Sequence, residues 1–173
     1  MKLKDHETWH KLTYDLLYPA ILGSMLYDVV NLQIRLDWIA VSKYCLVVLY
    51  CLDYLHLFAD LLQLKKVRSS WRYTIFDGLI PIIFGFTYWS VSNQDLLAVV
   101  IFFIALTAFM FVYILSLKLR RLGQAVLFLL SIIFGIVSFI KGFAGGWYVA
   151  EFIALCVVWY TINVFIICKD FRT

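Results

Sequence analysis

This sequence contains few of the residues from which linkers and low-complexity tails are built. Its 173 residues include only two prolines and eight glycines, and 15% of them are charged. An average soluble domain has about 25% charged residues. The polar segments between the apolar runs are also short, so the sequence excludes a separate domain between those runs.

Apolar residues are abundant instead. Hydrophobic residues make up 64% of the chain and aromatic residues 18%, with a mean hydropathy of +0.91. Soluble domains average about 45–50% apolar residues. The core of a soluble protein of 173 residues does not need an apolar content as high as 64%. The composition therefore predicts an integral, multi-pass membrane protein that has the lipid bilayer as its surroundings.

The apolar runs have the length of membrane-spanning helices, which need about 20 largely apolar residues. Six runs qualify: 14–34, 38–64, 74–92, 96–117, 121–141 and 147–168. We predict an all-α fold, a polytopic membrane helix bundle of about six transmembrane helices, within a single domain at 14–168. Residues 1–13 are expected to form a polar cytoplasmic lead-in and 169–173 a cytoplasmic tail.

The first run is the least typical, because it contains Asp15, Pro19, Asp28 and Asn31. A hairpin that dips into the bilayer and returns, or a helix lying in the interface, would also accommodate these residues. Whether this run crosses completely stays open.

Basic residues favour one orientation. With six spans, 12 of the 15 lysines and arginines fall on one side: Lys2, Lys4, Lys11, Lys65, Lys66, Arg68, Arg72, Lys118, Arg120, Arg121, Lys169 and Arg172. Cytoplasmic loops carry this excess, so both termini are expected in the cytoplasm. The net charge of +4 then reflects loops facing anionic lipid, and nucleic acid is not an expected partner.

The four cysteines, Cys45, Cys51, Cys156 and Cys168, lie in the spans or at a span end without C-x-x-C spacing. We interpret them as small buried apolar residues, and no cofactor is expected from them.

Two charged residues near the outer ends of the first two spans predict an ion pair. Asp28 lies in a span that runs outward, and Lys43 lies in the next span, which runs inward. Both are five or six residues from the outer helix ends, so they have similar depth. We expect them to form a structural salt bridge between adjacent helices.

Titratable residues also gather toward the inner end. Asp53, His56 and Asp60 are spaced i, i+3 and i+7, so they share one face of the second helix. Asp77 lies one turn into the third span. Acids at membrane depth are functional candidates, and histidine exchanges protons near neutral pH. The set predicts a cation or proton path, although loop lysines and arginines could instead neutralise the acids.

The segment "VRSSWRYTIFDGLIP" (67–81) resembles the beginning of the third helix in voltage-sensor domains of six-helix cation channels. In that family an aromatic residue precedes an inner aspartate, as Trp71 precedes Asp77. The preceding helix of that family carries an aromatic residue three positions before an acid, and Tyr50 and Asp53 have that spacing. The segment "LKLRRLG" (117–123) resembles the basic linker between the fourth and fifth helices. The resemblance implies a channel-type helical scaffold.

Two departures limit that implication. Residues 96–117 contain no arginine or lysine, so the gating charges are missing. The turn "KGFAGG" (141–146) is too short for a re-entrant selectivity filter. Voltage sensing and a standard pore are therefore not expected.

A second motif, "HETWH" at 6–10, has the H-E-x-x-H spacing of zinc hydrolases. His6 and His10 would bind the metal and Glu7 would act as general base. In membrane site-two-type proteases a distant aspartate is the third ligand, a role that the resemblance gives to Asp77 in "FDG". The flanking charges favour a solvated lead-in, so zinc remains the alternative cofactor.

These features predict a small membrane protein that forms or contributes to an assembly conducting or transporting a cation or proton. One chain leaves little room for a wide path, so a homo-oligomer or a membrane partner protein is expected. The alternatives are a structural subunit of a larger membrane complex and the intramembrane zinc protease.

Overall fold

The computed structural model describes residues 12–31, 37–63, 71–116, 122–141 and 145–170. Side chains are described for all of these except 56–63, 71–77, 113–116, 122–124 and 163–170. The described residues form a π-helical segment and six α-helices and contain no strand. They are η1 (Leu12–Leu17), α2 (Tyr18–Asn31), α3 (Trp38–Gln63), α4 (Trp71–Ser92), α5 (Leu96–Ser116), α6 (Leu122–Ile140) and α7 (Gly146–Asp170).

The all-helical fold confirms the helical part of the fold prediction. Each of the last five helices coincides with an apolar run identified in the sequence. For the first run, η1 continues directly into α2 and does not turn back within Leu12–Asn31. A hairpin within these residues is therefore wrong.

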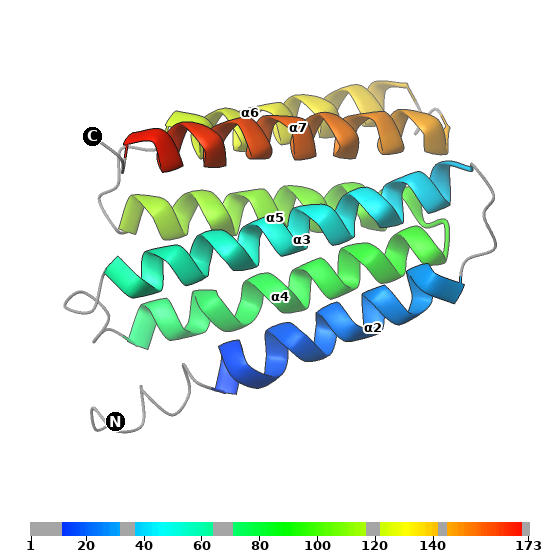
Figure 1. The fold of residues 1–173 in the computed structure, drawn as a ribbon. Coiled ribbons are helices and arrows are strands. Elements are labelled where there is room, and N and C mark those ends of the chain that lie inside the picture. The colour runs from blue at the N-terminus through cyan, green and yellow to red at the C-terminus, as the bar shows by residue number, and fades with distance from the viewer. Residues whose placement is uncertain (1–11, 32–36, 64–70, 117–121, 142–144, 171–173) are drawn as a thin grey trace.

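Successive helices run in opposite directions along the bundle (Figure 1). The beginning of η1 and the end of α7 lie at the same end, as do the end of α3 and the beginning of α4. α3 packs against α2, α4 and α7. α5 packs on α4, α6 packs on α7, and α5 and α6 pack on each other. The basic segments of the sequence join helices whose ends therefore lie together at one end of the bundle.

Two aspartates cap the N-termini of helices at the other end of the bundle. Asp37 Oδ1 accepts the backbone N–H of Ala40 at 2.8 Å, and Asp95 Oδ1 accepts that of Ala98 at 3.0 Å. Each bond satisfies one of the N–H groups that the first helical turn leaves without a partner. Asp37 and Asp95 therefore act as N-caps of α3 and α5.

Aromatic rings fill the space between α5, α6 and α7. Phe134 and Phe152 stack with centroids 3.9 Å apart, and Phe103 meets Phe152 edge to face at 5.6 Å. A hydrogen bond of 2.6 Å between the hydroxyls of Thr107 and Ser131 joins α5 to α6 nearby. These buried contacts fix the half of the bundle that lies away from α2.

A close backbone approach joins the beginnings of α3 and α7. A Cβ atom built on Gly146 would lie 2.0 Å from Trp38 Cδ2, so only glycine fits under this indole ring. The preceding Gly145 has φ +78°, a conformation that glycine adopts without strain.

Large apolar side chains are exposed on all six helices. Examples are Tyr27 on α2, Val48 on α3, Trp89 on α4 and Phe139 on α6. Among the described residues one stretch, Trp38–Leu55, is long and apolar enough to cross a membrane. Four shorter apolar stretches are Gly78–Ser92, Leu96–Val112, Ala125–Ile140 and Gly146–Ile162.

Candidate functional site

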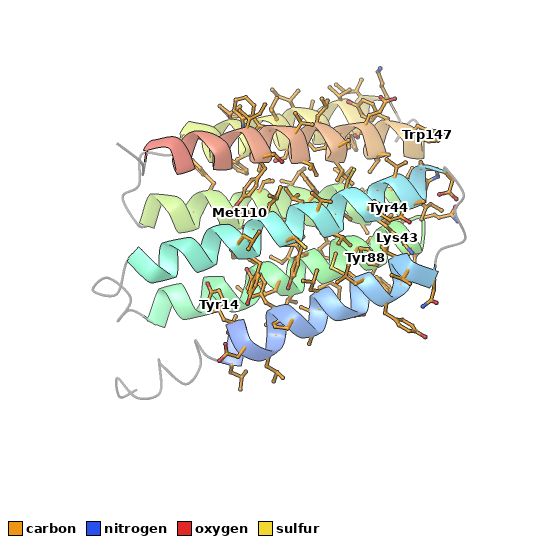
Figure 2. All side chains as sticks on the ribbon, in the orientation of Figure 1. Tyr14, Lys43, Tyr44, Tyr88, Met110 and Trp147 are labelled. Carbon is orange, nitrogen blue, oxygen red and sulfur yellow. The ribbon has the colours of Figure 1, made fainter. Side chains whose placement is uncertain are left out.

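Two acids, Asp28 on α2 and Asp53 on α3, each join three helices. We call Asp28, Lys43 and Tyr88 the Asp28 cluster. It connects α2, α3 and α4 near the end of the bundle at which α2 ends, where Figure 2 labels Lys43 and Tyr88. The structure brings together the pair that depth along the first two spans predicts.

The carboxylate of Asp28 receives two short hydrogen bonds on the same oxygen. Lys43 Nζ lies 2.7 Å from Asp28 Oδ2, and the hydroxyl of Tyr88 donates to Oδ2, also at 2.7 Å. The Tyr88 hydroxyl is also 3.2 Å from the backbone oxygen of Met25. A charged donor and a phenol thus hold the carboxylate against α3 and α4.

The two charges of this pair differ in their access to solvent. The Lys43 side chain is 6% exposed, whereas that of Asp28 is 45% exposed. Lys43 Nζ also lies 5.3 Å from the centre of the Tyr88 ring, within the range of a cation–π interaction. The ammonium is therefore enclosed by its partners, and the carboxylate faces the outside of the cluster.

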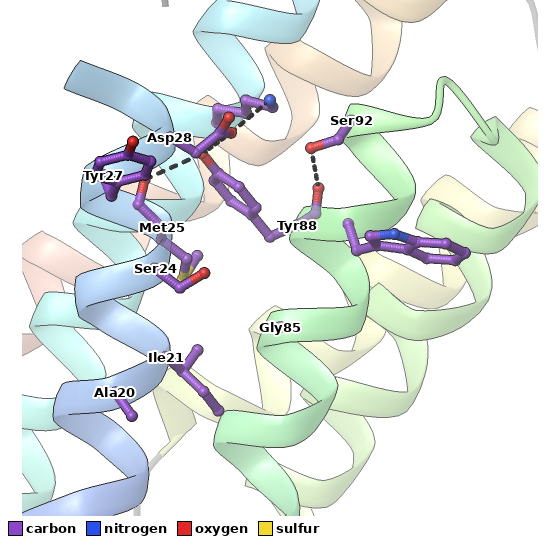
Figure 3. Close-up of a pocket in the computed structure, with 11 residues that line it drawn as sticks. Ala20, Ile21, Ser24, Met25, Tyr27, Asp28, Gly85, Tyr88 and Ser92 are labelled. Atoms are coloured by element: carbon purple, nitrogen blue, oxygen red, sulfur yellow. Dashed lines mark hydrogen bonds and ion pairs between the residues drawn. The ribbon is translucent and has the colours of Figure 1, made fainter. Parts of the chain in front are cut away.

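A groove of about 560 Å³ opens beside this cluster, between α2 and α4 (Figure 3). Its lining residues are Ala20, Ile21, Ser24, Met25, Tyr27, Asp28, Lys43, Gly85, Tyr88, Trp89 and Ser92. Apolar residues line one end, and the Asp28 cluster lines the other.

The second acid lies deeper in the bundle. Asp53 is 3% exposed, and its two oxygens face hydroxyls from two other helices. Tyr18 on α2 donates to Oδ2 and Tyr160 on α7 donates to Oδ1, both at 3.3 Å. We call these three residues the Asp53 cluster. An ionised carboxylate only accepts hydrogen bonds, so two phenol donors suit it.

Further tyrosines surround Tyr18. Tyr50 donates its hydroxyl to the backbone oxygen of Tyr18 at 3.1 Å, and its ring lies 5.2 Å from the Tyr18 ring. Tyr14 stacks on Tyr18 at 5.5 Å, and Tyr54 lies 5.3 Å from it. This packing fixes the Tyr18 ring and thereby the position of its hydroxyl at Asp53.

Apolar side chains occupy the turns of α3 that separate the two clusters. Leu46 and Leu49 are 0% and 1% exposed, and Phe84 from α4, at 0%, meets the Tyr50 ring edge to face. Along α3, Leu46 and Leu49 thus stand between Lys43 of the Asp28 cluster and Asp53.

The other residues of the predicted path are placed by their backbone only. His56 and Asp60 belong to α3, which is continuous from Asp53 through both, and Asp77 belongs to the first half of α4. Their side chains lie outside the described residues.

The alternative zinc motif, His6, Glu7 and His10, lies wholly outside the described residues, as does the side chain of its third ligand, Asp77. Within the described part, no group of three histidine, cysteine, aspartate or glutamate side chains is placed to hold a metal ion. Cys45, Cys51 and Cys156 are free thiols there, half-buried or buried.

Sequence reasoning missed the tyrosines that complete both clusters. Tyr18, Tyr88 and Tyr160 lie inside apolar runs, where tyrosine is easily counted with the other aromatic residues. A buried tyrosine usually needs a hydrogen-bond partner, and that requirement could have identified them as candidates.

Comparison of the chain with protein-family models, with curated proteins and with solved structures finds no match. The site is therefore interpreted from its own geometry.

Proposed function

We propose that this protein crosses a membrane with six helices and conducts or transports a proton or small cation, as a homo-oligomer or with a membrane partner protein. The observation that carries this proposal is the burial of Asp53 within the Asp53 cluster, between three helices.

The membrane placement rests on the outward-facing apolar side chains and on the distribution of charge. Large apolar residues are exposed on every helix, where water would disfavour them and lipid would not. The basic segments adjoin helix ends at one end of the bundle (Figure 1), which would face the cytoplasm together with both termini.

In that placement Asp53 lies inside the hydrocarbon layer. α3 has 26 residues and is thus about 39 Å long, against a hydrocarbon thickness of about 30 Å. Asp53 is about 15 Å from the end of α3 at Gln63. An acid at this depth costs about 2.5–3.5 kcal/mol on insertion scales, and such residues commonly mark ion or proton pathways.

The path would continue from Asp53 toward the basic end through His56 and Asp60, with Asp77 on the neighbouring helix. Their spacing places one titratable residue on each successive turn of α3. Toward the other end of the bundle, Leu46 and Leu49 on α3 and Phe84 on α4 are fully buried, so passage across the whole bundle would require such apolar side chains to move.

The test is ion flux in liposomes that contain the purified protein, driven by an imposed membrane potential. Internal dyes would report protons, sodium and potassium in parallel. The proposal expects Asp53→Asn to reduce flux at least tenfold. Asp95→Asn is the matched control, because it removes an exposed carboxylate while asparagine still caps α5.

A structural subunit is the second candidate, favoured by the Asp28 cluster, which ties three helices together through one carboxylate. For that function, Asp53→Asn would lower thermal stability or assembly, and the wild-type protein would show no flux above empty liposomes. Measuring flux and stability on the same preparations separates the two functions.

The alternative function as a zinc protease is tested by measuring the metal content of protein purified without chelators. About one zinc per chain, lost in His10→Ala, would support hydrolysis through His6, Glu7 and His10. Metal-free wild-type protein would remove this alternative.

A further inference from the structure

The groove between α2 and α4 changes in character along its length (Figure 3). Ala20, Ile21 and Gly85 line one part, and Asp28, Tyr88 and Ser92 line the part near the end of the bundle. Its volume of about 560 Å³ is within the range of small-molecule sites. A ligand that fits this lining has a polar head and an apolar chain.

The charge that a ligand would meet at the polar end is negative. Lys43 is enclosed at 6% side-chain exposure, while Asp28 is 45% exposed. Among the described residues, both hydrogen bonds to the carboxylate go to Oδ2. Oδ1 therefore remains available to a donor from the groove, which favours a cationic head group.

Aromatic rings on both walls favour the same kind of head group. Tyr27 on α2 is 76% exposed and Trp89 on α4 is 62% exposed, and both line the groove. The faces of such rings attract ammonium groups. Tryptophan and tyrosine are also typical of the level at which lipid head groups lie.

We propose that this groove binds a zwitterionic phospholipid. Its ammonium group meets Asp28 between Tyr27 and Trp89, and its acyl chain lies along Ile21 and Gly85. The assignment rests on the membrane placement in the proposed function but not on ion flux. An anionic head group without an ammonium would meet the exposed carboxylate and bind less well.

Native mass spectrometry of the full chain in detergent tests this assignment. The protein is exposed to equimolar phosphatidylethanolamine and phosphatidylglycerol with identical acyl chains, two lipids whose phosphate carries an ethanolamine ammonium in the first and an uncharged glycerol in the second. We expect at least a fivefold excess of bound phosphatidylethanolamine. Equal binding of the two lipids would overturn the proposal.

A pair of glycine variants locates the site. Gly85 lines the groove, and a Cβ atom there would meet Ile21 at 3.8 Å, so a leucine would extend into the space that the chain occupies. Gly23 on α2 has nothing within 4 Å of its Cβ position and is not part of the lining. Gly85→Leu should reduce phosphatidylethanolamine binding at least fivefold, and Gly23→Leu should not. Equal binding in both variants would contradict this location.

The role of the carboxylate is tested in the double variant Asp28→Asn/Lys43→Met, which leaves no unpaired buried ammonium. It should bind the two lipids equally, and a retained preference would overturn the role of Asp28. Soluble phosphoethanolamine should fail to displace the lipid at millimolar concentration. Displacement would show that a free head group is the ligand instead. Because lipid binding is read by mass, it can fail or succeed independently of flux.

Discussion

Asp28 and Asp53 both connect three helices through one carboxylate, but the groups that bind the two carboxylates differ. Each carboxylate joins three helices, Asp28 through an ammonium and a phenol at 2.7 Å and Asp53 through two phenols at 3.3 Å. Asp28 is half-exposed beside a groove, whereas Asp53 is 3% exposed.

This difference separates a structural pair from a candidate transport residue. Lys43 Nζ lies 2.7 Å from the half-exposed Asp28 carboxylate, so the pair ties α2 to α3 at the edge of the bundle. The phenols of Tyr18 and Tyr160 donate hydrogen bonds but carry no positive charge. Their two hydrogen bonds hold the buried Asp53 carboxylate between α2, α3 and α7, where the proposed path needs a titratable group.

The largest expected effect comes from removing one partner of the pair. Asp28→Ala leaves the enclosed ammonium of Lys43 without its carboxylate and should lower the free energy of unfolding by about 3 kcal/mol. Unfolding of the detergent-solubilised protein by increasing amounts of a denaturing surfactant measures this free energy. Adding Lys43→Met should restore most of the loss, and a double variant as unstable as the single one would show that the pair is not the cause.

The Asp53 cluster should respond less to the loss of one donor. Tyr160→Phe removes one hydrogen bond to the carboxylate and keeps the ring, so we expect a loss of about 1.5 kcal/mol. Tyr44→Phe is the matched control on an exposed tyrosine and should change the stability by less than about 0.5 kcal/mol. Equal effects of the two changes would remove the Tyr160 bond from the account.

Removal of the same hydroxyl from the Asp28 cluster should cost less still. In Tyr88→Phe the ring can stay near Lys43, and water can replace the lost donor because Asp28 is half-exposed. We expect about 1 kcal/mol, measured in the same titration. A larger loss than in Tyr160→Phe would reverse the proposed order of the two clusters.

Ionic strength should have the smallest effect. Salt screens charges that solvent reaches and leaves buried groups almost unaffected. The coupling between Asp28 and Lys43, obtained from a double-mutant cycle, should fall by a few tenths of a kcal/mol between low and high salt. The effect of Tyr160→Phe should stay constant, and a salt dependence there would indicate that water reaches Asp53.

The helices could be predicted from the sequence because each is an apolar run of suitable length bounded by polar residues. The Asp28–Lys43 pair could be predicted as well, because counting residues along two consecutive helices compares their depth directly. This information is local and needs no knowledge of how the helices are arranged around the bundle.

The rest of both clusters depends on that arrangement. Tyr160 reaches Asp53 across 107 positions of the chain, because α7 packs on α3. Tyr88 reaches Asp28 across 60 positions, because α4 lies beside α2. Hydropathy treats these tyrosines as apolar residues and gives no helix neighbours, so neither contact nor the groove could be derived from the sequence.

The most direct test of the central claim is the initial rate of ion flux in liposomes at equal protein density, for wild type, Asp53→Asn and Asp95→Asn. The account predicts wild-type rates for Asp95→Asn and at least a tenfold lower rate for Asp53→Asn, with both variants folded at the assay temperature. Wild-type flux in folded Asp53→Asn would contradict it, because the buried acid would then have no part in the path.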